Sequence, residues 1–230
     1  MQRLTFTFDN GPAPGATEKV LDFLAERSIK ATFFVVGDRL RTSQCRRLAE
    51  RAHAAGHWIG NHTLSHGEPL GFIGNRSHVE REIGETQRLL GTLAHHRKLF
   101  RPNGKGSLGP HLLSREAVAY LVDHRFTVVT WNSVPRDWEE PKSAWLDRAC
   151  ADVAKLPWSL LVLHDEHIAG MMNSLIEFHC RVVEMGVEIV QELPPDCVPI
   201  SNGKVCAAID GLVTRDAAAA RSTSEPASAS

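Results

Sequence analysis

Short apolar runs alternate along this chain with longer stretches in which apolar residues recur every three or four positions. The continuous apolar run 31–36 is typical of a strand covered on both faces. The stretch 17–28 places Val20, Leu21 and Leu24 on one side of a helix. The same alternation predicts strands at 3–8, 31–36, 57–60, 98–100, 126–130, 158–163 and 187–190, and helices at 17–28, 43–55, 76–94, 112–124, 143–154 and 172–185.

Strands that alternate with amphipathic helices predict an α/β fold with a parallel sheet. An open doubly wound sheet and a closed barrel both fit this pattern. In either case the carboxyl ends of the strands gather at one edge, where the active sites of such folds lie. Polar, Gly-rich segments follow five of the predicted strands, at 9–15, 61–67, 101–109, 132–138 and 164–167. We therefore expect these five segments to meet at one site.

The chain is long enough for one domain, which we place at residues 1–213 of 230. Residues 214–230 are rich in Ala and Ser without an apolar period, so we predict a disordered tail. The 26 Lys and Arg nearly balance the 27 Asp and Glu, which argues against a nucleic-acid partner. No apolar run approaches the ~20 residues of a membrane span. A strand close to residue 1 leaves no room for a signal peptide, so we expect a cytoplasmic protein or a trimmed exported one.

The first two polar segments carry the clearest chemistry. Asp9, at a strand end before Gly11-Pro12, is placed to point a carboxylate into the mouth of the sheet, although Asx residues are also common in plain turns. His62 and His66 are four residues apart, which on a helical turn puts both rings on one face, near enough to bind one divalent metal. The alternative is two unrelated residues among 12 histidines.

The other three segments each add one or two candidate groups. Arg101 follows a strand, where it can orient a carboxylate, and Asp137 stands beside the aromatic Trp138. His164 ends an apolar strand, a suitable place for a general acid. A surface ion pair, a packed Trp and a capped helix start are the structural alternatives for these segments.

In this order, T-F-D-x-G-P, H-T-x-x-H, R-P-x-G, D-W and L-H-D resemble the five motifs of the NodB-homology polysaccharide deacetylases, carbohydrate esterase family 4. The resemblance covers about residues 4–193. It implies a distorted (β/α)7 TIM-like barrel. It also implies a hydrolase that removes an N-acyl group, above all an N-acetyl group, from an amino-sugar oligo- or polysaccharide. The sequence does not indicate an oligomeric state.

The resemblance implies that Asp9 is the base that takes a proton from the attacking water, with Arg101 bracing it. His62 and His66 match the metal ligands, and zinc suits such a site, although cobalt, nickel and manganese also fit. The family's third ligand is an Asp, but this chain has Asn10. Three outcomes are open: a loosely held metal with Asn10 as a poor ligand, Asp9 as the ligand instead, or a site without metal.

The resemblance also implies that Asp137 holds and tunes His164, the acid that protonates the departing amine. Trp138 and Val162 match the walls of the acyl pocket. This division of labour suits an amide, because its carbonyl is a poor electrophile and its amine a poor leaving group; a metal answers the first problem and an acid the second.

The third motif departs from the family pattern, because only Pro102 and Asn103 separate Arg101 from Gly104, one residue fewer than usual. We assign Gly104 to substrate binding. The shortening puts in doubt the backbone N–H that stabilises the oxyanion in the family. Two other functions therefore stay open: hydrolysis of a small non-carbohydrate amide, and glycan binding without catalysis, the latter because of Asn10.

Overall fold

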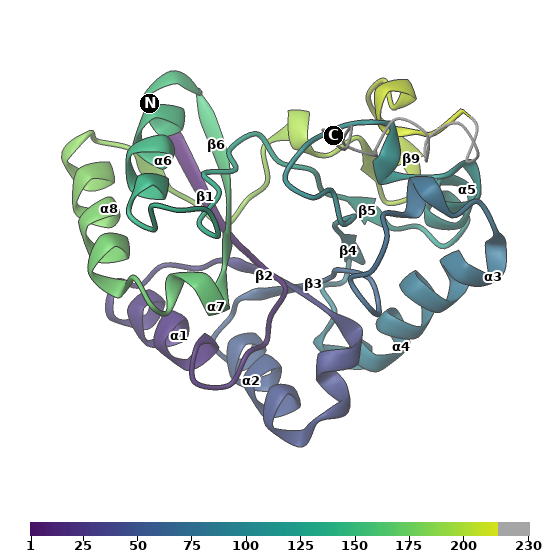
Figure 1. Cartoon of the computed structure of the whole chain (residues 1–230), viewed down its shortest axis with the longest axis horizontal. Coiled ribbons are helices and arrows are strands. Elements are labelled where there is room, and N and C mark those ends of the chain that lie inside the picture. The colour runs from purple at the N-terminus through teal and green to yellow at the C-terminus, as the bar shows by residue number, and fades with distance from the viewer. Residues whose placement is uncertain (216–230) are drawn as a thin grey trace, which may run out of the picture.

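A curled parallel sheet organises the fold in this computed structural model, which describes residues 1–215 (Figure 1). The strand order is β6-β1-β2-β3-β4-β5, and all pairings within this order are parallel. The strands are β1 (Arg3–Asp9), β2 (Thr32–Val35), β3 (Trp58–Asn61), β4 (Leu99–Phe100), β5 (Thr127–Val128) and β6 (Trp158–His164). A seventh, β7 (Glu188–Ile189), pairs with the first residues of β1. Each predicted strand is present, usually shorter by a few residues.

The curl of the sheet brings its two sides together. Ser133, downstream of β5, forms a parallel bridge with Leu161 of β6. An antiparallel hairpin that the sequence pattern did not predict, β8 (Ile200–Ser201) and β9 (Lys204–Val205), extends the sheet from β5. The architecture is the distorted (β/α)7 barrel that the resemblance implied.

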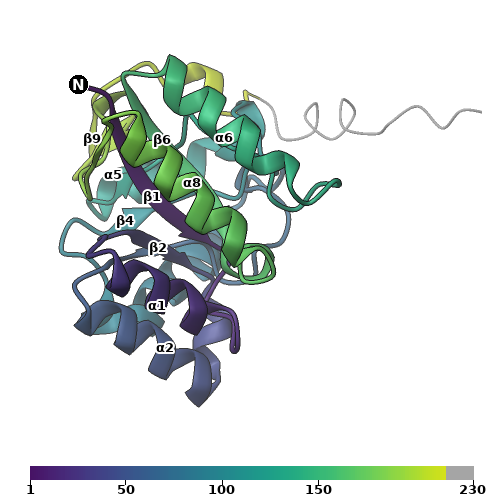
Figure 2. The same cartoon turned by 90° about the vertical axis from the view of Figure 1, so that its left-hand side faces the viewer.

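Helices cover the outer face of the sheet, and Figure 2 shows α6 and α8 in front of β1 and β6. The regular helices are α1 (Thr17–Glu26), α2 (Ser43–Ala54), α5 (Arg115–Asp123), α6 (Ala144–Lys155) and α8 (Met172–Glu184). A short helix, α7 (Asp165–Ile168), follows β6 directly. The predicted helix at 76–94 is segmented into α3 (Arg76–Val79), a π-helical stretch η3 (Glu80–Glu85), α4 (Thr86–Leu90) and a 3₁₀ turn, η4 (Gly91–Leu93).

The side chains of strand β1 point alternately into the hydrophobic core and toward the site. Leu4, Phe6 and Phe8 pack into the core layer beneath the helices, where the Phe6 ring meets Phe178 of α8 at 5.9 Å. Successive side chains point to opposite faces of a strand. Thr7 and Asp9 therefore point to the inner side of the barrel, where both contact Arg101.

The predicted domain boundary lies close to the last described residues. Thr214, which we assigned to the tail, is buried instead and donates hydrogen bonds to Leu113 O and Pro110 O at 2.9 and 2.7 Å. Residues 216–230, the rest of the predicted disordered tail, lie outside the described residues. None of the helices within residues 1–215 is long and apolar enough to cross a membrane.

Candidate active site

The five polar segments meet at the carboxyl ends of the strands, as the sequence predicted. They surround one cavity of about 270 Å³. Its lining includes predicted site residues from all five segments, namely Asp9, Asn10, His62, His66, Gly104, Trp138, Val162 and His164. Arg101 and Asp137 are fully buried behind this lining.

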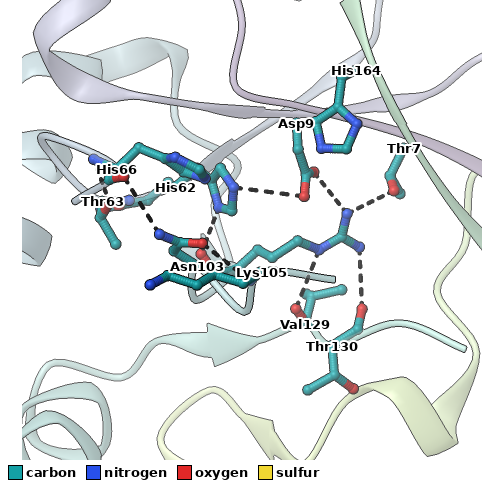
Figure 3. A network of polar contacts seen from close by, with 12 residues as sticks. Thr7, Asp9, His62, Thr63, His66, Asn103, Lys105, Val129, Thr130 and His164 are labelled. Carbon is teal, nitrogen blue, oxygen red and sulfur yellow. Dashed lines mark hydrogen bonds and ion pairs between the residues drawn. The ribbon is translucent and has the colours of Figure 1, made fainter. Parts of the chain in front are cut away.

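Arg101 holds Asp9 from behind, as predicted. Its guanidinium is fully buried and donates to Asp9 Oδ1 at 2.8 Å and to Thr7 Oγ1 at 2.7 Å (Figure 3). Two backbone carbonyls beyond β5, of Val129 and Thr130, accept its remaining hydrogen bonds at 3.4 and 3.1 Å. Burial alone raises the pKa of Asp9, but the nearby Arg101 charge, with His62 and His164, outweighs it and lowers that pKa. Asp9 is therefore an ionised carboxylate at neutral pH.

His62 and His66 lie side by side, with their ring centroids 4.9 Å apart. His62 Nδ1 is 2.8 Å from the backbone oxygen of Arg101, so Nδ1 carries the proton and Nε2 offers its lone pair to the cavity. That Nε2 lies 3.6 Å from Asp9 Oδ2. Burial lowers the pKa of His62, and burial with the neighbouring His62 lowers the pKa of His66 to about 3. Both rings are thus neutral, the form that binds a metal.

The prediction that a helical turn carries both histidines is wrong. Residues 62–66 form an irregular loop, and Thr63 and His66 have φ angles of 65° and 51°. Side chains take the place of helical hydrogen bonds: Asn61 Oδ1 accepts from Thr63 N at 3.0 Å, and Thr63 Oγ1 accepts from His66 N at 3.1 Å. The rings come together through this loop geometry rather than through helical periodicity.

Asn10 provides an oxygen without a partner. Its Oδ1 is buried and accepts no hydrogen bond from the residues that the structure describes, although Asn10 lines the cavity beside His62 and His66. A buried amide oxygen without a donor is costly unless something else binds it. Within residues 1–215 no three His, Cys, Asp or Glu side chains are arranged to hold a metal ion. Two neutral imidazoles and an amide oxygen without a donor are groups of the kind that divalent ions bind, so the chemistry of His62, His66 and Asn10 fits such an ion.

Asp137 holds His164 on the other side of the cavity. Its Oδ1 is 2.7 Å from His164 Nδ1, and its Oδ2 accepts the backbone N–H of His164 at 2.8 Å. Burial alone lowers the pKa of His164, but the hydrogen bond and charge of Asp137 outweigh it and raise that pKa. The Trp138 ring stands edge-to-face against the imidazole at 5.1 Å. Because Nδ1 is occupied, Nε2 is the nitrogen left to donate a proton.

Asp165, the residue after His164, is also buried, and no cationic side chain within residues 1–215 forms an ion pair with it. Asp165 accepts a hydrogen bond from Thr17 Oγ1, and its other oxygen has no partner among the described residues. Its carboxyl lies against Gly11, where it leaves no room for a Cβ. Burial raises the pKa of Asp165 to about 6. Through its contact with Gly11, the Asp165 carboxyl group packs against the loop that follows Asp9.

More apolar residues line the cavity than the sequence predicted. Val162 and Trp138 line the cavity as expected, but Trp131 and Val134 line it too. Gly104 lies so close to the Trp131 ring that a Cβ cannot fit, so the predicted substrate-binding role rests on backbone alone. Trp131 directly precedes the polar segment 132–138, and Val134 lies within it. Proximity to this segment is the sequence feature from which both could have been predicted as site residues.

The shortened third motif folds back onto the histidine loop. Asn103 Nδ2 donates to the backbone oxygen of Gly67 at 2.7 Å, and its Oδ1 accepts from Lys105 N at 3.3 Å. The Lys105 N–H is therefore already engaged. The ammonium of Lys105 pairs instead with Glu68 at 3.6 Å on the surface.

Comparison with known proteins identifies the family of this chain. The polysaccharide deacetylase family model matches residues 2–120. A chitooligosaccharide deacetylase of Sinorhizobium fredii is 35% identical over 163 residues, 69% of this chain and 70% of the relative. A peptidoglycan-N-acetylglucosamine deacetylase of Bacillus cereus is 28% identical over 192 residues, 81% of this chain and 66% of the relative.

Solved structures give the same result for the fold. A peptidoglycan N-acetylglucosamine deacetylase is 27% identical with a TM-score of 0.67, over 87% of this chain and 89% of that one. A pseudoenzyme of carbohydrate esterase family 4 from Bacillus anthracis has a TM-score of 0.68 at 20% identity, over 84% and 65% of the two chains, and shows the fold alone. With the family model matching half of its length, this chain belongs to the polysaccharide deacetylase family.

Proposed function

We propose that this chain is a metal-dependent hydrolase that removes the N-acetyl group from N-acetylglucosamine units of an oligo- or polysaccharide. One observation carries the proposal: the carboxylate of Asp9, with its lowered pKa, and the imidazole of His164, with its raised pKa, face the same cavity, each held by its own buried partner. Pairs of groups whose environments push their pKa values apart are typical of acid–base sites. Family membership and the named activities of the relatives support the substrate class.

His62 Nε2, the His66 ring and Asn10 Oδ1 are the groups that we assign to a divalent metal, zinc above all, with cobalt, nickel and manganese as further candidates. Such an ion supplies positive charge that polarises the amide carbonyl. The backbone oxygen of Arg101 fixes the tautomer of His62, as outer groups do for many metal-bound histidines. With a neutral amide as the third ligand, we expect looser binding than a carboxylate gives.

Asp9 is placed to accept the proton of the attacking water. Arg101 occupies its Oδ1, so Oδ2 is the oxygen left for this proton. As the water oxygen bonds to the carbonyl carbon, the proton passes to Asp9 Oδ2. Arg101 keeps the Asp9 carboxylate ionised. It also fixes the direction of that carboxylate, because three further hydrogen bonds hold the guanidinium itself in place.

His164 is placed to complete the reaction on the leaving group. As the C–N bond breaks, Nε2 gives its proton to the sugar nitrogen, and the products are a free amine and acetate. Asp137 stabilises the imidazolium before this step and keeps the ring oriented. Trp138 and Val162 line the cavity with apolar surface, against which we place the methyl group of the acetyl.

The direct test is acetate release from N-acetylglucosamine oligomers, with chelator and with added zinc or cobalt. We expect release that chelator stops and added ion restores. Asp9→Ala should abolish it, and a rate that the substitution leaves unchanged would sink this mechanism. Release that persists after complete metal removal would contradict the role assigned to His62, His66 and Asn10.

One observation favours a second function, glycan binding without catalysis. Asn10 brings no negative charge, so an ion is held less firmly than beside an acidic ligand. Binding of the oligomers without acetate release under any ion would choose this function. Activity on a small amide but not on acetylated sugars would instead point to a non-carbohydrate substrate, in line with the shortened third motif.

A further inference from the structure

The loop that carries both histidines, residues 62–66, has an unusual backbone. Thr63 and His66 both lie in the left-handed region, at φ 65° and 51°. That region is unfavourable for residues with a Cβ unless surrounding groups hold them there. The direction of the His62 and His66 rings depends on this backbone. Something outside the loop must therefore fix it.

Glu82 contacts the loop from beneath. Its side chain is only 4% exposed. One carboxylate oxygen, Oε2, accepts three hydrogen bonds from the loop: Leu64 N at 3.1 Å, Ser65 N at 3.0 Å and Ser65 Oγ at 3.0 Å. A carboxylate that accepts several N–H and O–H bonds makes the stronger, charge-assisted kind. The two amides it caps are the ones that lie between the two left-handed residues.

A second contact joins the same two regions. Glu82 lies in the π-helical stretch η3, and such stretches occur frequently at functional sites. The next residue, Ile83, accepts at its backbone oxygen a hydrogen bond from Asn61 Nδ2 at 2.9 Å. Asn61 Oδ1 in turn accepts Thr63 N at 3.0 Å. The π-helical stretch thus holds the loop at its start and at its middle.

We propose that Glu82 is a positioning residue that sets the direction of His62 and His66, and with it the affinity of the site for a divalent ion. The inference rests on the proposed function for the presence of that ion. Glu82 acts through the loop rather than on substrate, since it does not line the cavity.

The expected effect follows from what each substitution removes. Glu82→Ala deletes all three hydrogen bonds and leaves two buried amides without an acceptor. Outer groups that hold metal-bound histidines change metal affinity by about 10–100-fold when lost, and we expect that range here. Glu82→Gln keeps a neutral acceptor of the same shape, so it should lose less. Ser65→Ala removes one bond of the three and should have the smallest effect.

The test is zinc affinity, measured by competition with a chromogenic chelator, together with the visible absorption of the cobalt form. Glu80→Gln is the matched control, because Glu80 is exposed on the same π-helical stretch. We expect affinity to fall in the order wild type and Glu80→Gln, Ser65→Ala, Glu82→Gln, Glu82→Ala, with a changed cobalt spectrum for the last. Wild-type affinity in folded Glu82→Ala would overturn the proposal.

Two further measurements keep the result interpretable. Thermal unfolding reports stability separately from zinc affinity. If Glu82 has a purely structural role, Glu82→Gln and Ser65→Ala should have a lower melting temperature but an unchanged zinc affinity. That result would contradict the proposal even if Glu82→Ala does not fold. Acetate release by the wild type tests the proposed function on its own. A wild type whose zinc affinity depends on Glu82 but that releases no acetate would contradict the proposed function and leave the positioning role intact.

Discussion

The two sides of the cavity fix their side chains by different means. On the acid–base side, Asp9 and His164 each have a buried partner of opposite charge, Arg101 and Asp137, at 2.8 and 2.7 Å. On the other side, the ligand side where we propose the metal, His62, His66 and Asn10 are neutral and have no direct partner of opposite charge among the described residues that sets their protonation; the backbone, Asn61, Thr63 and the Glu82 carboxylate hold the loop that carries the histidines. The protein therefore sets the charges of the first side itself, whereas the second depends on what binds there.

Asp9→Asn breaks the acid–base side most directly. The amide keeps the shape of the carboxylate and an oxygen for Arg101, but it cannot accept the proton of water. We expect kcat for acetate release to fall by about 10²–10⁴-fold, the usual size of a general-base contribution. Circular dichroism should show an intact fold. A rate within a few-fold of wild type would mean that another group is the base.

Asp137→Asn removes the charge that keeps His164 protonated. Asp137 holds the pKa of His164 above its ordinary value of 6.5, so its loss should lower that pKa. Since the acid must carry its proton, the alkaline limb of the pH–rate profile should move to lower pH, with a loss of about tenfold or more at pH 8. An alkaline limb that stays in place would show that His164 is not the titrating acid.

Asn10→Asp gives the ligand side the negative charge that it lacks. A carboxylate ligand should tighten zinc binding by about tenfold or more, because it neutralises part of the ion's charge. Competition with a chelator measures this, and Asn132→Asp, at a position that does not line the cavity, is a control for added charge. Unchanged zinc affinity in Asn10→Asp would show that residue 10 does not contact the ion.

Asp165 extends the comparison, because it follows His164 directly but forms no ion pair with any cationic side chain that the structure describes. Its pKa is raised from 3.8 to about 6, so the folded state resists its ionisation. That cost is absent below about pH 4 and complete above about pH 6, on the order of 3 kcal/mol at most. Asp165→Asn should remove it. We expect thermal unfolding to favour the variant more at pH 7.5 than at pH 4.5, and an equal difference at both pH values would contradict this.

Much of this arrangement could be predicted from the sequence. Apolar periodicity located all the parallel strands, and strand ends then located Asp9, Arg101, Asp137 and His164. These successes rest on local pattern and on one topological rule. Whether Asn10 replaces an acidic ligand in function is still a prediction.

The failures arise where local pattern carries no information. The loop 62–66 was predicted as a helical turn because spacing alone cannot reveal left-handed residues such as Thr63, which Asn61 and its neighbours stabilise. Glu82 looked like one charged residue among several on a helix, and only the tertiary fold shows that it is buried. The hairpin β8–β9 was missed because Ile200–Ser201 and Lys204–Val205 each contain one apolar and one polar residue and do not form an apolar run.

The place of β1 in the sheet has a consequence for how the chain is made. β1 precedes the other described strands in the chain, yet one of its edges pairs along its whole length with β6, residues 158–164. On a ribosome, that edge and the Asp9 carboxylate stay in water until most of the chain has emerged. Residues 2–120, which match the family model, do not include β6, so we do not expect this segment to fold on its own. A fragment that ends before β6 would leave an open edge that is prone to aggregate.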